Sequence, residues 1–154
     1  MSKELRDQLS QLLDWDNAHI RFDDAVKDFP PELRGTRPAG GPHSPWELLE
    51  HLRIALSDIL EFTRDAKHVS PEFPSGYWPA SAEPPTDKAW DESIARYRAD
   101  LRAFAELTAD DGVDLMGRIP HGTGQTVLRE ILLAVDHNAY HVGQLMMVRR
   151  ILGA

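Results

Sequence analysis

The chain has 154 residues, 42% of them hydrophobic, and its 25 acidic and 17 basic side chains give a formal net charge of -8. A chain of this length and composition can bury one core, so we expect a single domain that spans residues 1–154. The negative charge disfavours a nucleic acid as partner, because it repels a phosphate backbone. The absence of cysteine excludes disulfides, thiolate ligands and a cysteine nucleophile, which leaves histidine and carboxylate as the strong metal ligands.

The hydropathy pattern contains no candidate for a membrane anchor. The first seven residues are largely charged and lead directly into an amphipathic pattern, and no run approaches eighteen apolar residues. We therefore expect a soluble cytoplasmic protein that does not enter a membrane.

Proline divides the chain into helical segments. The eleven prolines fall within residues 30–45, 71–79, 84–85 and 120, and four long segments around them are free of proline. The first, from about Lys3 to Phe29, is predicted to be one helix because its apolar residues recur with a period of 3.6. This apolar stripe consists of Leu5, Leu9, Leu12, Leu13, Ala18, Phe22, Ala25 and Val26.

The second segment has the clearest helix start in the chain. Ser44 is the predicted N-cap, Pro45 takes the first helical position, and Glu47 completes a capping box. His51 lies at the border of the apolar stripe of this helix. The stripe consists of Leu48, Leu52, Ala55, Ile59 and Phe62.

The third predicted helix runs from a Thr86 cap to about Leu107, and the fourth from near Thr126 to Gly153. Together the four segments predict an all-α fold, a four-helix bundle with long interhelical connections. The connections have roughly 15 to 19 residues, where about 2 to 8 are usual. The linker from Asp65 to Pro85 is long enough to run the length of the bundle, which would make the second and third helices parallel.

Two histidines form a helical pair. His137 and His141 are four residues apart in an apolar segment without proline, so in a helix both rings leave the same face one turn apart. His51 is the best candidate for a third ligand, because it is the only other histidine within a strong apolar helical pattern. Three neutral imidazoles can hold zinc, nickel or iron and leave coordination positions open. The alternative is that the histidines pack without a metal, with His51 bonded to Glu47 or Asp58.

Two stretches of the sequence carry a resemblance to a known family. They are SPWELLEHL at residues 44–52 and AVDHNAYHVGQL at residues 134–145. With one histidine early in the second helix and a His-x-x-x-His pair in the fourth, the chain resembles the DinB-like (DinB/YfiT) superfamily, a group of proposed metalloenzymes. The likeness extends over nearly the whole chain.

The resemblance implies a bundle, often dimeric, in which His51, His137 and His141 bind a divalent metal. We expect this metal to be zinc or nickel, or else iron. Members similar to this family include bacillithiol-type thiol transferases, and related folds include a mycothiol-dependent isomerase. We therefore expect a homodimer that acts on a small-molecule substrate, as a metal-dependent hydrolase or a transferase of a low-molecular-weight thiol. The alternative is a non-catalytic dimeric bundle with a structural metal or packed histidines.

A general base has to come from outside the histidine pair. Asn138 stands where His-Glu-x-x-His proteases carry their glutamate, so that class of enzyme is not expected. By pattern, the candidates are Asp58 on the second helix and His19 and Asp23 on the first. Each is alternatively a hydrogen-bond partner of a ligand or a surface charge.

Other residues are predicted near the site with less defined roles. Tyr140 and Gln144 flank the histidine pair on its own helix, where they either orient a ligand or pack. The loop from residue 73 to residue 79 concentrates aromatic side chains, and it is predicted either to fold over a cleft as a lid or to cover the apolar side of the bundle. His43 and His121 lie in connections rich in Gly and Pro, and the sequence does not place them.

Overall fold

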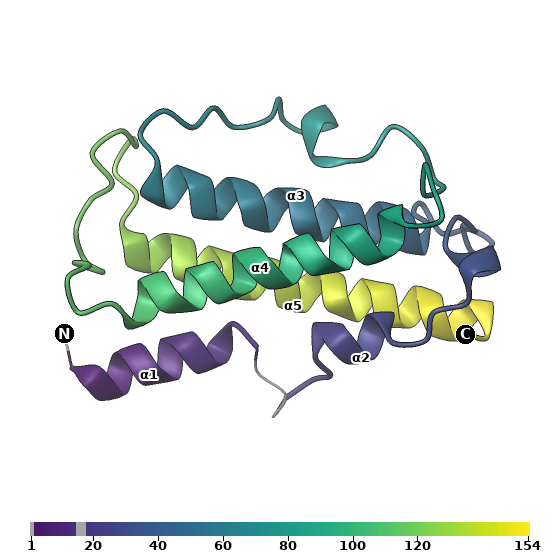
Figure 1. Cartoon of the computed structure of the whole chain (residues 1–154), viewed down its shortest axis with the longest axis horizontal. Coiled ribbons are helices and arrows are strands. Elements are labelled where there is room, and N and C mark those ends of the chain that lie inside the picture. Colours follow the sequence, from purple (N-terminus) through teal and green to yellow (C-terminus); the bar gives the residue numbers. More distant parts are fainter. Residues whose placement is uncertain (1, 15–17) are drawn as a thin grey trace.

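The computed structural model describes residues 2–14 and 18–154, and the elements in this part of the chain are helical (Figure 1). The only extended pairing among these residues is a single bridge between Arg118 and Thr126. The all-α fold is therefore confirmed. The elements are α1 (Lys3–Leu12), α2 (Phe22–Val26), η1 (Pro31–Leu33), α3 (Pro45–Arg64), η2 (Ser75–Tyr77), α4 (Ala89–Ala109) and α5 (Val127–Leu152).

The helix α3 is the centre of the bundle. It packs against both α4 and α5, while α1 packs against α4 and the short α2 against α5. Figure 1 shows that α3 and α4 point in the same direction and that α5 runs opposite to both. The linker after α3 returns along the whole helix before α4 begins, as its length predicted.

Local signals define the start of α3 and both ends of α5. The Ser44 side chain accepts a hydrogen bond from the Glu47 backbone N–H, and the Glu47 carboxylate accepts one from the Ser44 N–H, so the predicted capping box is present. At the start of α5, Thr126 caps the Arg129 N–H. At its end, Gly153 adopts a left-handed conformation with φ of 75°. The starts of α3 and α5 and the end of α5 are where the sequence predicted them.

The core follows from the position of α3 between two neighbours. Five leucines of α3 are at most 1% exposed, which is more burial than one stripe of a surface helix provides. Buried side chains from α4 and α5 complete the core. They include Trp90, Tyr97 and Phe104 from α4, and Ile131, Ala134 and Leu145 from α5.

The first helix differs from the prediction of one helix over residues 3–29. Regular structure stops at Leu12 and resumes at Phe22, and residues 15–17 of the predicted helix lie outside the described residues. Ala18 is exposed, so the apolar stripe is not continuous. Two helices replace one because each half buries its apolar side on a different neighbour: α1 on α4, and α2 on α5. Phe22 also stacks on Tyr97, with ring centroids 4.0 Å apart.

The third helix begins later than a Thr86 cap predicts. The Thr86 backbone carbonyl, not its side chain, accepts a hydrogen bond from the Ala89 N–H, so Thr86 starts the turn that precedes α4. The helix then runs two residues beyond Leu107, to Ala109. Such shifts of a few residues are typical where a helix end lacks a side-chain cap.

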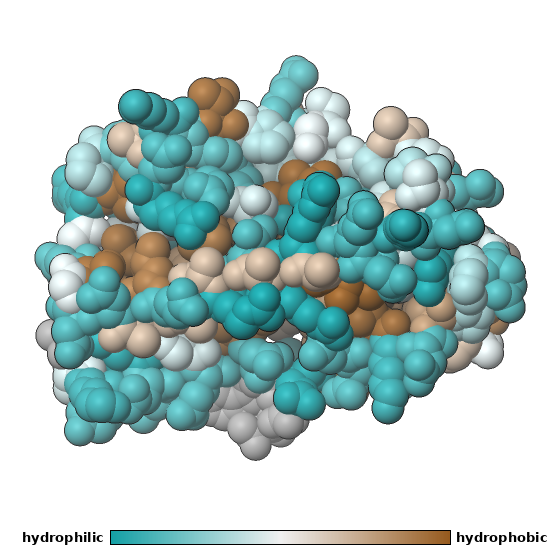
Figure 2. All heavy atoms as spheres, viewed as in Figure 1, coloured by the Kyte–Doolittle hydropathy of each residue, from teal (hydrophilic) through white to brown (hydrophobic). Residues whose placement is uncertain are grey.

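The surface is polar on the face drawn in Figure 2, where hydrophobic residues emerge only in separate patches between hydrophilic ones. Within residues 2–14 and 18–154, none of the helices combines the length and the apolarity that crossing a bilayer requires.

Candidate metal centre

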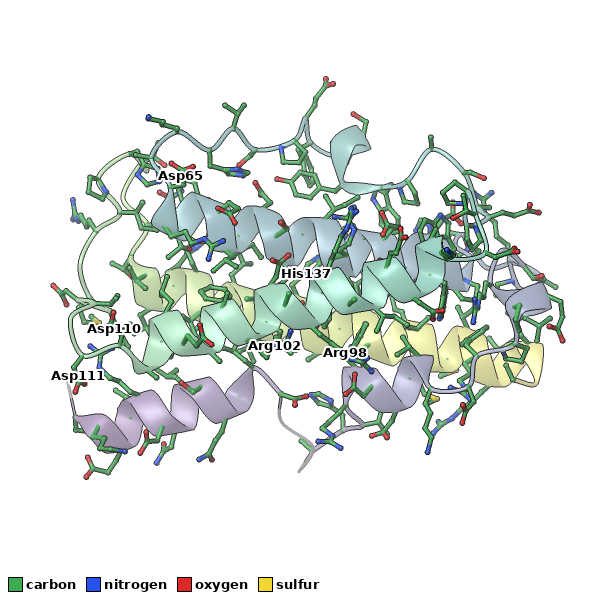
Figure 3. All side chains as sticks on the ribbon, viewed as in Figure 1. Asp65, Arg98, Arg102, Asp110, Asp111 and His137 are labelled. Carbon is green, nitrogen blue, oxygen red and sulfur yellow. The ribbon has the colours of Figure 1, made fainter. Side chains whose placement is uncertain are left out.

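Three histidines from two helices converge on one point. The Nε2 atom of His51 on α3 lies 3.0 Å from Nε2 of His141 and 3.1 Å from Nε2 of His137, both on α5. One ring nitrogen from each residue lies within 4.8 Å of the others. Figure 3 shows His137 about midway along the bundle, far from Asp110 and Asp111 at one end. The structure therefore brings together the three residues that the sequence predicted as ligands.

The spacing of these nitrogens suits a shared cation. Three nitrogens bound at about 2.0 to 2.1 Å from one ion, at angles between octahedral and tetrahedral, lie about 2.8 to 3.4 Å from one another. The two separations of Nε2 of His51, 3.0 Å and 3.1 Å, fall in this interval. The convergence fits a metal-binding protein.

The outer nitrogens of two rings fix where their protons are. Nδ1 of His51 faces the Tyr77 carbonyl oxygen at 2.9 Å, and Nδ1 of His141 faces the Gln144 side-chain oxygen at 2.7 Å. Both oxygens are acceptors, so each Nδ1 carries the hydrogen and donates it. In a neutral ring this leaves a lone pair on Nε2. Two lone pairs then face each other across 3.0 Å, an arrangement that a cation between them stabilises.

Burial keeps the three rings neutral. His51 and His141 are buried and His137 is partly buried. Burial lowers the pKa of His51 below its ordinary value, and it lowers the pKa of His137 and of His141 to about 4. The neighbouring imidazoles act in the same direction. The rings therefore have their metal-binding form at neutral pH.

Trp78 of the aromatic loop at residues 73–79 lies against the histidine cluster, and the role of this loop as a lid over a cleft stays a prediction. The Trp78 ring stacks on the His51 ring with centroids 4.0 Å apart and an interplanar angle of 3°. The His43 ring stacks on the opposite face of Trp78, again at 4.0 Å. The loop also supplies the Tyr77 carbonyl that accepts from His51. One wall of the site is therefore formed by the linker between α3 and α4.

Gln144 and Tyr140 form a chain of contacts that leads from His141 to the surface. Gln144 accepts from His141 through its oxygen and donates through its nitrogen to the Tyr140 hydroxyl at 3.2 Å. The Tyr140 ring also lies edge-on to the His141 ring, with centroids 4.9 Å apart. Of the two roles that the sequence left open for these residues, the geometry favours orienting a ligand.

Asp58 lies on the same side of α3 as His51 but does not reach the cluster directly. One of its oxygens accepts from the Tyr77 hydroxyl at 2.6 Å, and the other lies 2.7 Å from Nε2 of His68. Its connection to His51 thus runs through Tyr77. The role of Asp58 as a general base stays a prediction.

The other two candidate bases have their contacts elsewhere. His19 is exposed and its Nδ1 lies 2.8 Å from the Ile20 carbonyl oxygen. Asp23 forms a surface ion pair of 2.7 Å with Arg98, which lies on the side of α4 toward α2 (Figure 3). Neither of these contacts places His19 or Asp23 beside the three histidines. His121 is also distant, since its ring contacts the carbonyl of Phe62, three turns beyond His51 on α3.

Sequence reasoning missed the partners that the linker supplies. Trp78 and His68 belong to a segment with no helical period, so no pattern connected them to α3. The one available signal was the cluster of aromatic residues at 73–78, which is unusual for a polar linker. His43 was one of the two loop histidines that the sequence did not place.

Comparison with protein families gives one finding. The model described as "DinB superfamily" matches residues 14–145, which includes α3, α4 and all three histidines. Comparisons with curated proteins and with solved structures return no match.

Proposed function

The chain therefore belongs to the DinB superfamily, and from this premise we propose that it is a metal-dependent enzyme whose cation is bound by His51, His137 and His141. The observation that carries the proposal is that Nε2 of His51 lies 3.0 Å from Nε2 of His141 and 3.1 Å from Nε2 of His137, which is the separation of two nitrogens bound to one ion. The Nδ1 atoms of His51 and His141 already donate hydrogen bonds elsewhere. Zinc or nickel suits three neutral imidazoles best, and iron is the next choice.

The chain's own residues hold the centre and leave part of it open. Tyr77 and Gln144 fix the orientation of two imidazoles, and Trp78 shields one ring face from water. A divalent cation with three protein ligands supplies Lewis acidity, which lowers the pKa of a water or a thiol at an open position. This supports hydrolysis or the transfer of a low-molecular-weight thiol to a small-molecule substrate.

The first test is the metal content of protein purified without an affinity tag. We expect about one equivalent of a transition metal per chain after refilling, and a loss of most of it in His137→Ala. His121→Ala is the matched control, because this histidine is exposed and its ring contacts a backbone carbonyl. A wild-type content below about 0.2 equivalents after refilling would overturn the proposal.

A structural metal in a non-catalytic bundle is the competing function, which the burial of His51 and His141 favours. The melting temperature of His137→Ala distinguishes the two functions. A structural site should lose several degrees, since its binding energy contributes to folding. A catalytic site should keep the fold and lose turnover of thiol and ester substrates.

We also propose that the protein is a homodimer that uses α5. Large hydrophobic side chains project from α5 into solvent, and a second copy would bury them. They are Leu132, Tyr140, Met147 and Ile151, which are 47% to 63% exposed.

A further inference from the structure

Three aromatic rings form one continuous stack at the edge of the histidine cluster. Trp78 lies between His51 and His43, with centroids 4.0 Å from each ring and interplanar angles of 3° and 11°. His51 brings its Nε2 to the cluster, while its ring face rests on the indole. The stack therefore holds the plane of one ligand without occupying its metal-binding nitrogen.

The backbone around Trp78 is anchored on α3 at two points. The Tyr77 carbonyl accepts from His51 Nδ1, and the Tyr77 hydroxyl donates to Asp58, two turns further along the helix. His68 binds the second oxygen of Asp58 at 2.7 Å. The Asp58 carboxylate thus holds both ends of the segment from His68 to Tyr77, directly before Trp78.

The outer ring of the stack is also fixed. His43 directly precedes Ser44, whose hydroxyl donates to the Ala82 carbonyl at 2.6 Å and whose backbone N–H is bound by Glu47. The capping box of α3 therefore holds His43 against the outer face of Trp78. The indole is clamped between two imidazoles whose positions are set independently.

From this geometry we infer that Trp78 is a positioning residue of the metal centre and that it strengthens metal binding through His51. The inference rests on the proposed function, since it concerns the affinity of the same site. Two physical effects contribute. The stack restricts rotation of the His51 ring, so less freedom is lost when the ring becomes a ligand. The electron-rich indole face also attracts an imidazole whose positive charge increases on coordination.

The experiment compares zinc affinity, measured by competition with a chromophoric chelator, in wild type and three variants. Trp78→Leu removes the aromatic face, and Trp78→Phe restores a smaller one. Val69→Ala is the matched control, because Val69 lies in the same linker and is 85% exposed. Unfolding of each metal-free variant is measured in parallel, so that affinities are compared only between folded proteins.

We expect Trp78→Leu to bind zinc about 10-fold more weakly than wild type, as loss of a ligand's supporting contact does elsewhere. Trp78→Phe should recover most of this loss, and Val69→Ala should bind like wild type. The visible spectrum of the cobalt-loaded protein should change in Trp78→Leu, since His51 no longer has a fixed plane, and should be retained in Trp78→Phe.

Zinc affinity in Trp78→Leu within about twofold of wild type, with wild type binding zinc normally, overturns the inference and leaves the proposed function standing. Failure of wild type itself to bind zinc, nickel or iron overturns both. If metal-free Trp78→Leu does not fold, His43→Ala decides. Removing the outer ring loosens the indole, so a zinc affinity about threefold weaker supports the inference and an unchanged one contradicts it.

Discussion

The Nδ1–H of His141 donates a hydrogen bond of 2.7 Å to the side-chain oxygen of Gln144, one turn further along α5. This bond sets the ring orientation and directs Nε2 toward His51, 3.0 Å away. A partner of this kind also makes the coordinating nitrogen more basic. Gln144 is therefore linked to the metal centre without being a ligand.

Gln144→Leu should weaken zinc binding about 10-fold to 100-fold, because the His141 ring loses its acceptor and the Nδ1–H is left without a partner. Gln144→Glu should retain the affinity or increase it, since a carboxylate accepts the same hydrogen bond more strongly. Competition with a chelator measures both. Gln8→Leu is the control, because Gln8 is an exposed residue of α1. Equal affinities in Gln144→Leu and wild type would exclude this role.

The metal-free protein should lose stability as the pH falls from about 6.5 toward about 4. Burial lowers the pKa of His137 and His141 from 6.5 to about 4, whereas in the unfolded chain both rings titrate near the ordinary value. Between these values the unfolded state binds more protons, so the free energy of unfolding rises with pH and is lost on acidification. Urea unfolding at a series of pH values measures this slope.

The double variant His137→Ala, His141→Ala is the control for this slope. It lacks both groups, so its free energy of unfolding should depend less on pH in the same interval. Zinc should also stabilise the wild-type protein less as the pH falls, because protons compete for the same nitrogens. A slope that is identical in wild type and double variant would show that folding does not lower the pKa of these two histidines.

Ser44→Ala should lower the free energy of unfolding by about 1 to 3 kcal/mol, since the variant loses the N-cap of α3 and leaves the partly buried Ala82 carbonyl without its donor. Urea unfolding at pH 7 gives the value. Ser2→Ala removes the exposed cap of α1, whose bond to Leu5 is 3.4 Å long, and should cost less. Equal losses of unfolding free energy in the two variants would show that the cap of α3 contributes no more than the cap of α1.

Met147→Glu and Ile151→Glu should shift the protein from dimer to monomer, because each places a charge in the apolar side of α5 that we propose to be the contact. Sedimentation velocity distinguishes the two species. Val69→Glu provides the comparison, since Val69 is more exposed than either residue but belongs to the linker. A wild-type protein that sediments as a monomer at all concentrations would rule out the dimer.

The sequence predicted the elements whose signals are local. Ser44, Pro45 and Glu47 define the start of α3 because each acts within one helical turn, and Gly153 ends α5 for the same reason. The break between α1 and α2 could not be predicted from the apolar period, because it depends on which neighbouring helix each half contacts.

The same distinction applies to the site. His137 and His141 share a face through helical spacing alone, and His51 joined them by its place in the apolar pattern and by the family resemblance. Trp78 and His68 reach α3 only because an irregular linker folds back on it. No hydrophobic period in the sequence specifies the path of this linker, so the sequence alone does not predict these contacts.

The shared direction of α3 and α4 has a consequence for how this architecture can vary. The linker leaves α3 at the C-terminal end of that helix, and α4 begins beside the N-terminal end of α3 (Figure 1). The linker therefore has to pass His51, which lies near the start of α3. Insertions or deletions in that return path would therefore remodel the entrance to the histidines while the helices stay in place. The length of a single connection can in this way change what surrounds the histidines without any change in the helices that carry them.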